Sequence, residues 1–507
     1  MDWKFWQKKP EKAEKRDIIA DGIDGAEEYQ LPLPTINITY IFCTLKELNG
    51  AKHVQMIAEE LDIQPQQVAE DMEQLTKDMV EGLTCVLEYP YVDEYYRDAY
   101  YSFYSRKHNS YNRNCFRVSF FIGDVTEENF YDVDLDGKFL GYTVLQPTPK
   151  CIIGYTFLHP TIYKKCDFAI CICNHDSFVK GRKVTTTAFP YSGQDAEIKS
   201  CSENSLLMMC DYFSRRYNRY ARVLPSQIAD ELTDSVNNRQ QPTHGVDIDT
   251  VVSILNINGI TTRKYDKVGD GEVREADNCF AEEDFLRLLN IYVDSGFPIF
   301  MATNSHALLA IGRDDENGAI IAMNDNERPY SRYENLSEIK SFIVPIADNI
   351  LIDPRAVKTD EILSKLHETY PDVSFLRDGV EYEHRIFLTT SRSFKKHMVN
   401  SKLSKDNLEL VVCTAMPKFI WVSESIAKDN RHVKLKDSFV DTIIVIDATD
   451  APSAYNRLLM VKTREHLFIP MHDKTRLQRK IYSINNSTEQ MHPFMNNLKG
   501  AHSLWRD

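Results

Sequence analysis

Apolar side chains recur at helical spacing through residues 35–83 of this chain. Positions three and four apart share one face of a helix, so such a run predicts an amphipathic helix. Pro65 stands where a second helix would begin, in the first turn, which tolerates a missing N–H group. We therefore expect two packed helices, with apolar faces formed by Val54, Ile57, Ala58 and Leu61 and by Val68, Met72, Leu75 and Met79.

This pair has the outline of a helix-turn-helix, but its charge argues against binding to DNA. Residues 51–82 contain two lysines and eight acidic residues. A recognition helix needs cations that can meet phosphate groups. Ordinary helix packing is the better interpretation.

From about residue 115 to 187 the pattern changes to short runs of apolar, β-branched and aromatic residues. Gly, Pro, Asp and Asn separate these runs, which is typical of strands joined by turns. The region is therefore predicted to be rich in β-structure, with strands at 116–122, 139–145, 151–158 and 167–173.

Two patterns in this β-rich region resemble metal sites. The segment from Asp132 to Gly137 opens like a calcium loop, but Thr143 stands where that loop needs a bidentate Glu. A hairpin turn at Asp136 and Gly137 is favoured instead. The cluster from Cys171 to His175 has no second pair of ligands at zinc spacing. We expect no metal in either place.

Residues 91–121 are rich in tyrosine, and no acidic residue occurs from Ala99 to Phe121. Aromatic rings interleaved with cations can stack on bases or hold a phosphate. A solvated loop followed by the strand at 116–122 is the interpretation we prefer. The cations concerned are Arg106, Lys107, Arg113 and Arg117.

Composition sets limits on the class of protein. The 507 residues are 43% hydrophobic and 27% charged, with 60 Lys and Arg against 75 Asp and Glu, a net charge of −15. Such a chain has enough apolar residues for a core and does not suit binding to polyanions over its whole surface. At about 150 residues per domain the length predicts three domains.

Several features predict a cytoplasmic protein. No apolar run reaches the roughly 18 residues of a membrane-spanning helix, and the first residues lack an apolar signal core. The 11 cysteines are an odd number at irregular spacing, which is typical of reduced thiols rather than of a disulfide framework. We expect no contact with membranes.

A candidate nucleophile stands at the start of a predicted helix. Ser200 and Glu203 have the spacing of a capping box, which places Cys201 at the first helical position. A thiol there faces free backbone N–H groups and the positive end of the helix dipole, and both favour the thiolate. A small residue at a helix start is the plain alternative, and Cys210, within the apolar stripe, is interpreted in that way.

A candidate base and orienting group follow about a hundred residues later. Apolar runs predict strands at 297–302, 306–312 and 319–323, with a turn at 317–318. His306 opens the second strand, and Asp325 follows the third. Two adjacent antiparallel strands would bring the imidazole and the carboxylate close together, as a thiol nucleophile requires.

Residues 186–345 resemble the papain-like cysteine peptidases, in particular the bacterial double-glycine (bacteriocin-processing) group. The resemblance rests on a Gln seven residues before a Cys that begins a helix, then on the segments SGFPIF, HALLAIG and NDN in this order. It implies a papain-like fold. It places the nucleophile on Cys201, the general base on His306, the orienting acid on Asp325 with Asn324 as second choice, and the oxyanion-hole amide on Gln194.

The predicted fold class is α/β (α+β), with a papain-like domain at 186–345 between accessory regions. Residues 1–30 are expected to be a polar tail, 31–185 an accessory region (helical at 35–100, β-rich at 115–185), and 350–507 an α/β domain. In the last region we expect a helix around 359–366 and strands at 385–389, 409–413, 419–422 and 442–446.

The expected function is hydrolysis of a peptide or isopeptide bond through Cys201, His306 and Asp325, with Gln194 in the oxyanion hole and no cofactor or metal. The substrate would be a protein or peptide, and nucleic acid is not expected. Transglutaminase-like acyl transfer uses the same residues. A non-catalytic sensor or scaffold with this fold is a further alternative, as is nucleic-acid binding through residues 104–117. Substrate preference, regulation and oligomeric state are not predicted.

Overall fold

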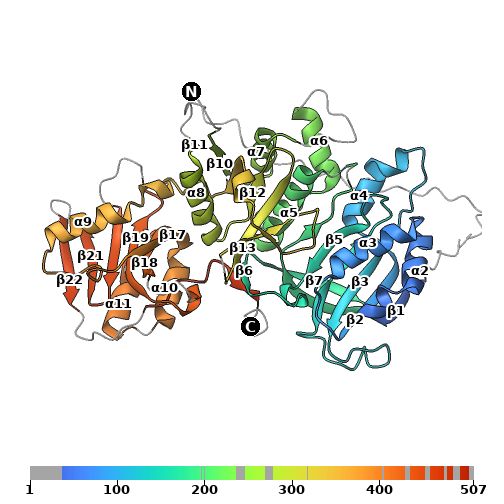
Figure 1. Ribbon diagram of the computed structural model, residues 1–507, viewed down its shortest axis with the longest axis horizontal. Helices are drawn as coiled ribbons and strands as arrows, with labels where there is room; N and C mark the ends of the chain where they lie inside the picture. The colour runs from blue at the N-terminus through green and yellow to red at the C-terminus, as the bar shows by residue number, and fades with distance from the viewer. Residues whose placement is uncertain are drawn as a thin grey trace, which may run out of the picture. The chain divides into compact units, whose positions relative to one another are not determined.

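The computed structural model describes residues 37–501, except for 196, 199, 236–245, 269–277, 317, 402, 404, 429–433, 451–456, 473–476 and 484–490. The predicted tail at 1–30 lies outside these residues. The described part is a mixed α/β protein in which three largely antiparallel sheets carry helices on their faces (Figure 1). No described helix is long and apolar enough to cross a membrane.

The first sheet has the order β1-β2-β3-β4-β5-β9. Three helices, α1 (Leu45–Leu48), α2 (Ala51–Leu61) and α3 (Pro65–Thr76), connect its first two strands, and α4 (Glu94–Ser102) follows the second. The strands are β1 (Thr39–Thr44), β2 (Leu83–Tyr91), β3 (Cys115–Ile122), β4 (Phe139–Leu145), β5 (Ile153–Leu158) and β9 (Tyr191–Ser192).

The predicted helix pair is confirmed, and its two apolar faces are buried. Two strands correct the prediction. Residues 39–44 and 83–91 lie in the region expected to be helical (35–100) but form β1 and β2, because the two segments pair with each other and β2 also pairs with β3. Helix α4 falls largely within the same predicted helical region, although its tyrosine-rich sequence is interpreted above as a loop. The Asp93 carboxylate caps it by accepting from the Tyr96 N–H at 2.8 Å, as helix N-terminal positions favour.

The predicted strands at 116–122, 139–145 and 151–158 are confirmed as β3, β4 and β5. The turn at Asp136 and Gly137 lies directly before β4, and Gly137 has a φ of 71°. It ends a long connection from β3 rather than forming a tight hairpin, which corrects the prediction. The segment at 167–173 contributes β6 (Phe168–Ile170), and β7 (Cys173–Val179) and β8 (Arg182–Ala188) form a separate hairpin.

The central sheet has the order β11-β10-β16-β12-β13-β14-β15. Helix α5 (Cys201–Arg216) packs against β13 of this sheet, and α8 (Glu282–Asp294) packs against β13 and β10. Helix α7 (Ile248–Ile257) contacts α5, and α6 (Pro225–Ser235) contacts α7. The strands are β10 (Thr262–Lys267), β11 (Cys279–Phe280), β12 (Ile299–Ala302), β13 (Ala307–Asp314), β14 (Ile320–Met323), β15 (Ser331–Tyr333) and β16 (Ser341–Pro345).

The third sheet has the order β17-β18-β19-β20-β21-β22. Helices α9 (Thr359–Thr369), α10 (Ser391–Asn400) and α11 (Lys405–Cys413) accompany it. The strand predicted at 409–413 is wrong, because these residues end α11. The strands are β17 (Tyr382–Thr390), β18 (Phe419–Ala427), β19 (Val440–Asp447), β20 (Leu458–Thr463), β21 (His466–His472) and β22 (Leu477–Ser483).

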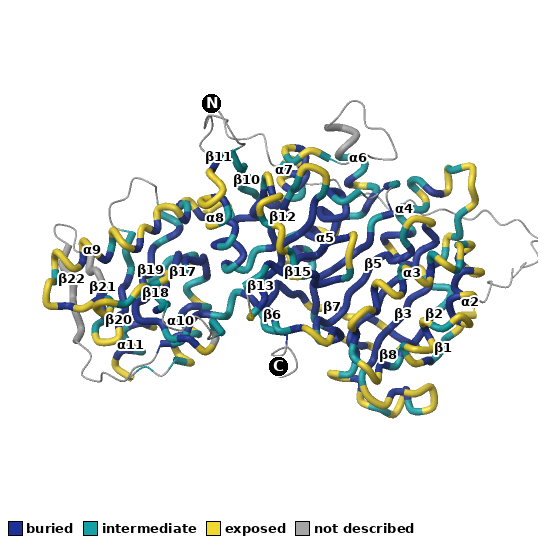
Figure 2. The backbone as a smooth tube through the Cα atoms, viewed as in Figure 1, coloured by how far each residue is buried: buried dark blue, intermediate teal, exposed yellow. Residues whose placement is uncertain are grey.

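Strand pairing crosses the predicted domain limits. β6, from the N-terminal region, pairs with β13 of the central sheet, and β23 (Lys499–Gly500), near the end of the chain, pairs with β6. The central strands and α5 are largely buried, as the tube in Figure 2 shows. The central sheet is therefore completed and covered by segments from both flanking regions.

Candidate functional site

Helix α5 begins at Cys201, as the sequence predicts. The Ser200 backbone N–H donates to Glu203 Oε2 at 2.8 Å, and the Asn204 N–H donates to the Ser200 carbonyl at 2.9 Å. Every residue from Ser202 to Phe213 is buried, whereas Cys201 is partly exposed. The thiol thus stands at the accessible end of a helix that packing holds in place.

A turn fixes His306 at the start of β13. The Thr303 hydroxyl oxygen accepts a hydrogen bond from the His306 N–H at 3.0 Å, and the Thr303 N–H donates to the His306 carbonyl at 2.8 Å. The antiparallel pairing of β12 and β13 closes this turn. β14 pairs with β13 on its other side and leads directly to Asn324 and Asp325.

The amide of Asn324 lies beside the imidazole. His306 Nε2 and Asn324 Oδ1 are 2.8 Å apart. The same Oδ1 accepts from the Asn326 N–H at 3.1 Å, and Asn324 Nδ2 donates to Glu327 Oε1 at 3.3 Å. Since a backbone N–H can only donate, Oδ1 must be the acceptor, and His306 Nε2 carries a proton. Nδ1 is the ring nitrogen left to exchange a proton with Cys201.

Asp325, the first choice as orienting group, lies slightly farther from the ring. Its Oδ1 is 3.7 Å from His306 Nε2, and its side chain is fully buried. Its Oδ2 accepts from Asn204 Nδ2 at 3.2 Å. Asn204 also donates to the Ser192 carbonyl at 2.6 Å, so this residue connects the helix of Cys201 to the Asp325 carboxylate. Asn324 is the nearer partner of the imidazole, and Asp325 supplies the buried negative charge.

The surroundings of His306 favour its protonated form. Burial by itself lowers the pKa of an imidazole. Here the contacts with the Cys201 thiol and with Asn324, and the charge of Asp325, outweigh burial and raise the pKa of His306 to about 9. At neutral pH the ring is therefore a cation beside the thiol, the arrangement that favours an imidazolium–thiolate pair.

Cys201 and His306 line one cavity of about 410 Å³. Its walls come from the start of α5, the start of α7, the turn at 303–306 and residues of β12 and β16. This volume falls within the range of ligand-binding clefts. The thiol and the imidazole are thus both accessible to a molecule that enters this cavity.

Gln194 lies apart from this cavity. Its amide nitrogen donates to the Asn326 side chain, and it lines a second cavity of about 510 Å³ together with Asp325, Asn326 and residues of α3. The structure therefore brings Cys201, His306, Asn324 and Asp325 together, while Gln194 contacts the loop after Asn324. A part for Gln194 in an oxyanion hole stays a prediction.

Sequence analysis did not identify Asn204, Thr303 or Glu327 as part of the site. Asn204 gave no signal in the sequence, because it lies on the face of α5 opposite the apolar stripe of Leu206, Met209 and Phe213, and tertiary packing buries it. The hydrogen bonds of Thr303 and Glu327 depend on the geometry of two loops, which spacing along the chain does not reveal.

The other motifs have structural partners. Of the four cations in the tyrosine-rich segment, Lys107 pairs with Glu197 and Arg117 is buried against Glu88, while Arg106 and Arg113 are exposed. His175 contacts Tyr142 and Arg215. Among the described residues, no group of three or more His, Cys, Asp and Glu side chains is arranged to hold a metal ion.

Comparison with known proteins adds no assignment. No protein-family model matches this chain, and no curated protein or solved structure is significantly similar to it. The site must therefore be interpreted from its own geometry.

Proposed function

We propose that this protein is a thiol hydrolase that cleaves peptide or isopeptide bonds, and that residues 186–345 form a papain-like domain. The observation that carries the proposal is the cavity that Cys201 and His306 both line, together with the hydrogen bond between His306 Nε2 and Asn324 Oδ1. A nucleophile at a helix start, a base and an orienting amide are the parts that thiol catalysis needs.

The reaction begins with attack of the Cys201 sulfur on the carbonyl carbon. The S–C bond forms while the carbonyl π pair moves to oxygen, and the backbone N–H of Cys201 stabilises the oxyanion. His306 holds the proton that came from the thiol. When the C–N bond breaks, the ring gives this proton to the leaving amine. Water then loses a proton to His306, attacks the thioester carbon and releases the acid and the thiol.

A polymeric substrate fits the surroundings better than a small molecule does. One cavity contains Cys201 and His306, and the larger one contains the neighbouring Asp325 and Gln194. A peptide extends to both sides of its scissile bond, and the cavity of about 410 Å³ at Cys201 accommodates part of such a chain. The free thiols of all 11 cysteines agree with a reducing, cytoplasmic location.

The test compares Cys201 with the exposed Cys413. A limiting amount of iodoacetamide, followed by peptide mapping, should label Cys201 first although Cys413 is more accessible. The His306→Ala variant should lose this preference, and Cys413→Ala should keep it. Preferential labelling of Cys413 in the folded wild-type protein contradicts an activated thiol and favours the non-catalytic scaffold.

The product of the reaction separates hydrolysis from acyl transfer. Peptide mixtures incubated with the wild-type protein and with Cys201→Ala, in the presence of a primary amine, should yield new free carboxyl ends with the wild type alone. Amine adducts in their place would assign the acyl transfer reaction instead.

A further inference from the structure

The loop that leads into Cys201 is built around one buried carboxylate. Asp195 Oδ1 accepts hydrogen bonds from the N–H groups of Glu197 and Ile198, both at 2.9 Å. Asp195 is 2% exposed and Ile198 is 4% exposed. The backbone at Glu197 and Ile198, shortly before the nucleophile, is thus fixed by its own turn, which also has support from its surroundings.

That support comes from the tyrosine-rich segment, far earlier in the chain. The Lys107 ammonium forms an ion pair with the Glu197 carboxylate, and it lies 4.7 Å from the centroid of the Phe103 ring. A cation held by both a carboxylate and an aromatic face has restricted freedom. Lys107 therefore fixes Glu197, four residues before the nucleophile.

Tyr104 supports the same loop from the interior. Its side chain is 1% exposed. Burial raises the pKa of Tyr104, and the charges of Asp195 and Glu197 raise it further. The phenol therefore stays neutral near the Asp195 carboxylate. Its ring centroid lies 5.9 Å from the Lys107 ammonium, which pairs with Glu197, so both residues of the segment after α4 adjoin the acidic residues of the nucleophile's loop.

We propose that Lys107 and Tyr104 are positioning residues, which orient Cys201 for attack by holding the loop of Asp195 and Glu197. This inference rests on the proposed function of Cys201. It also gives the tyrosine-rich segment a function that needs no nucleic acid, since its cation and its ring face the protein's own carboxylates.

The exposure of the Lys107–Glu197 pair allows its effect on the reactivity of Cys201 to be measured separately from its effect on folding stability. The Lys107 and Glu197 side chains are 30% and 21% exposed, and ion pairs with such access to water contribute little to the free energy of folding. Small displacements of a reacting group, by contrast, cost reactivity steeply. Loss of the pair should therefore lower the reactivity of Cys201 while leaving the melting temperature nearly unchanged.

The experiment measures the second-order rate of Cys201 alkylation by iodoacetamide in the full-length protein. Lys107→Met should slow this rate roughly tenfold or more, and Lys107→Arg, which keeps the charge, should restore most of it. Lys164→Met is the matched control, because it removes an exposed lysine–glutamate pair with Glu81 that touches neither cavity. Its rate should equal that of the wild type.

Tyr104→Phe removes only the hydroxyl and gives a second, independent measurement. It too should slow alkylation of Cys201 with little change in melting temperature. Equal rates in the wild type, Lys107→Met and Tyr104→Phe would overturn the positioning role, as would a loss of rate that Lys107→Arg does not restore. Failure of the proposed function looks different, because the wild-type Cys201 would itself show no preferential reaction.

Discussion

His306 combines two properties that rarely coexist at one ring: it is largely buried and still favours its charged form. Burial opposes the cation, while Cys201, Asn324 and Asp325 support it, and the net pKa is about 9. A proton donor of this kind remains charged throughout the neutral range. The Cys201 thiol contributes to the raised pKa of His306, so a substitution of Cys201 tests the protonation state of the imidazole.

The pH dependence follows from this raised pKa. The leaving amine needs the imidazolium, so turnover should fall as pH rises through about 9. In Cys201→Ala the pKa of His306, followed by NMR titration, should fall, because burial is then less opposed. A His306 pKa that is the same in Cys201→Ala and in the wild type would show that the thiol does not contact the ring.

The same shift affects stability, and its sign is opposite to that of a paired carboxylate. The folded pKa lies above the ordinary value of 6.5. The stabilisation is therefore fully present below pH 6.5, decreases above it, and is lost as pH rises through about 9. Urea melts of the wild type and of His306→Ala should converge at the alkaline end of this window.

Asn324 and Asp325 are neighbours whose separate effects can be measured. Asn324→Ala removes the 2.8 Å partner of His306 Nε2 and should lower turnover by roughly 10²-fold, a typical share of acid–base catalysis. Asp325→Asn keeps the size of the side chain and removes its charge. It should lower the pKa of His306 while the ring stays oriented by Asn324. If Asp325→Asn abolishes turnover and Asn324→Ala does not, the carboxylate is the orienting group.

At the scale of elements, sequence patterns predicted best where one face of an element is buried. The faces of α2 and α3 and the start of α5 follow from helical spacing, Pro65 and the pair of Ser200 and Glu203. The order of β12, β13 and β14 follows from three apolar runs. These signals are local. Cys201 begins α5 and His306 directly precedes β13, so predicting where these elements start also predicted where the two residues lie.

The errors have a common physical cause. The run at 410–413 is apolar and β-branched in part, and such short runs fit a strand or a buried helix equally well. Its preceding residues continue the helix, and Val411 is buried beside α10. α4 is rich in tyrosine, a modest helix former, and its stability comes from burying Tyr95, Tyr96 and Ala99. In α11 and in α4, burial against other elements rather than local sequence preference determined the secondary structure.

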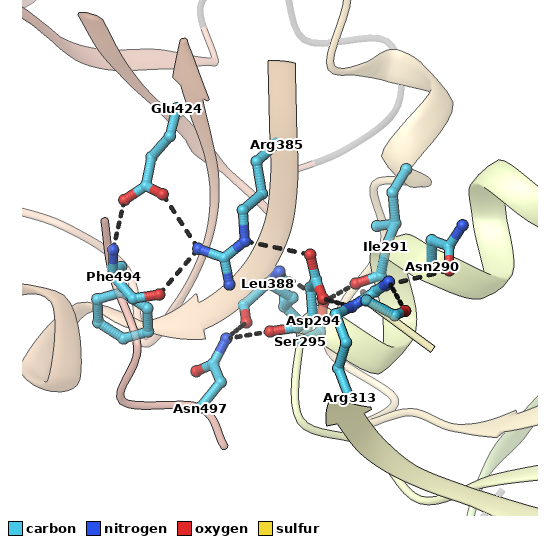
Figure 3. A network of polar contacts seen from close by, with 11 residues as sticks. Asn290, Ile291, Asp294, Ser295, Arg313, Arg385, Leu388, Glu424, Phe494 and Asn497 are labelled. Carbon is cyan, nitrogen blue, oxygen red and sulfur yellow. Dashed lines mark hydrogen bonds and ion pairs between the residues drawn. The ribbon is translucent and has the colours of Figure 1, made fainter. Parts of the chain in front are cut away.

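At the scale of the whole molecule, a largely buried network of charges joins the central and third sheets (Figure 3). Asp294, which ends α8, accepts from Arg313 of β13 at 2.9 Å and from Arg385 of β17 at 3.1 Å. Arg385 also donates to Glu424 at 3.1 Å and to the Phe494 carbonyl at 2.8 Å. The strand that follows His306 is thus connected to the C-terminal region.

The apolar core supports the same connection. Side chains of α8 and of the third sheet belong to one buried cluster, which includes Leu289, Trp421 and Ile444. Trp421 Nε1 also donates to the Ile352 carbonyl at 3.0 Å. The C-terminal region therefore packs with α8 into the core on one face of the central sheet. Substitutions at this contact should lower the free energy of unfolding of both sheets together.

Arg385→Met tests this contact, because it leaves the buried Glu424 without its cation, while Asp294 keeps Arg313. Breaking a buried pair in this way costs about 3–5 kcal/mol of unfolding free energy. Lys358→Met, which breaks an exposed pair with Glu361, should cost less than about 1 kcal/mol.

Burial already raises the pKa of Glu424, and Arg385 opposes this. Without the arginine, the carboxyl should take up a proton more readily, so the deficit of Arg385→Met should shrink as pH falls. Chemical denaturation of both variants at several pH values measures this. Equal costs for the two variants would show that the two sheets do not depend on this network.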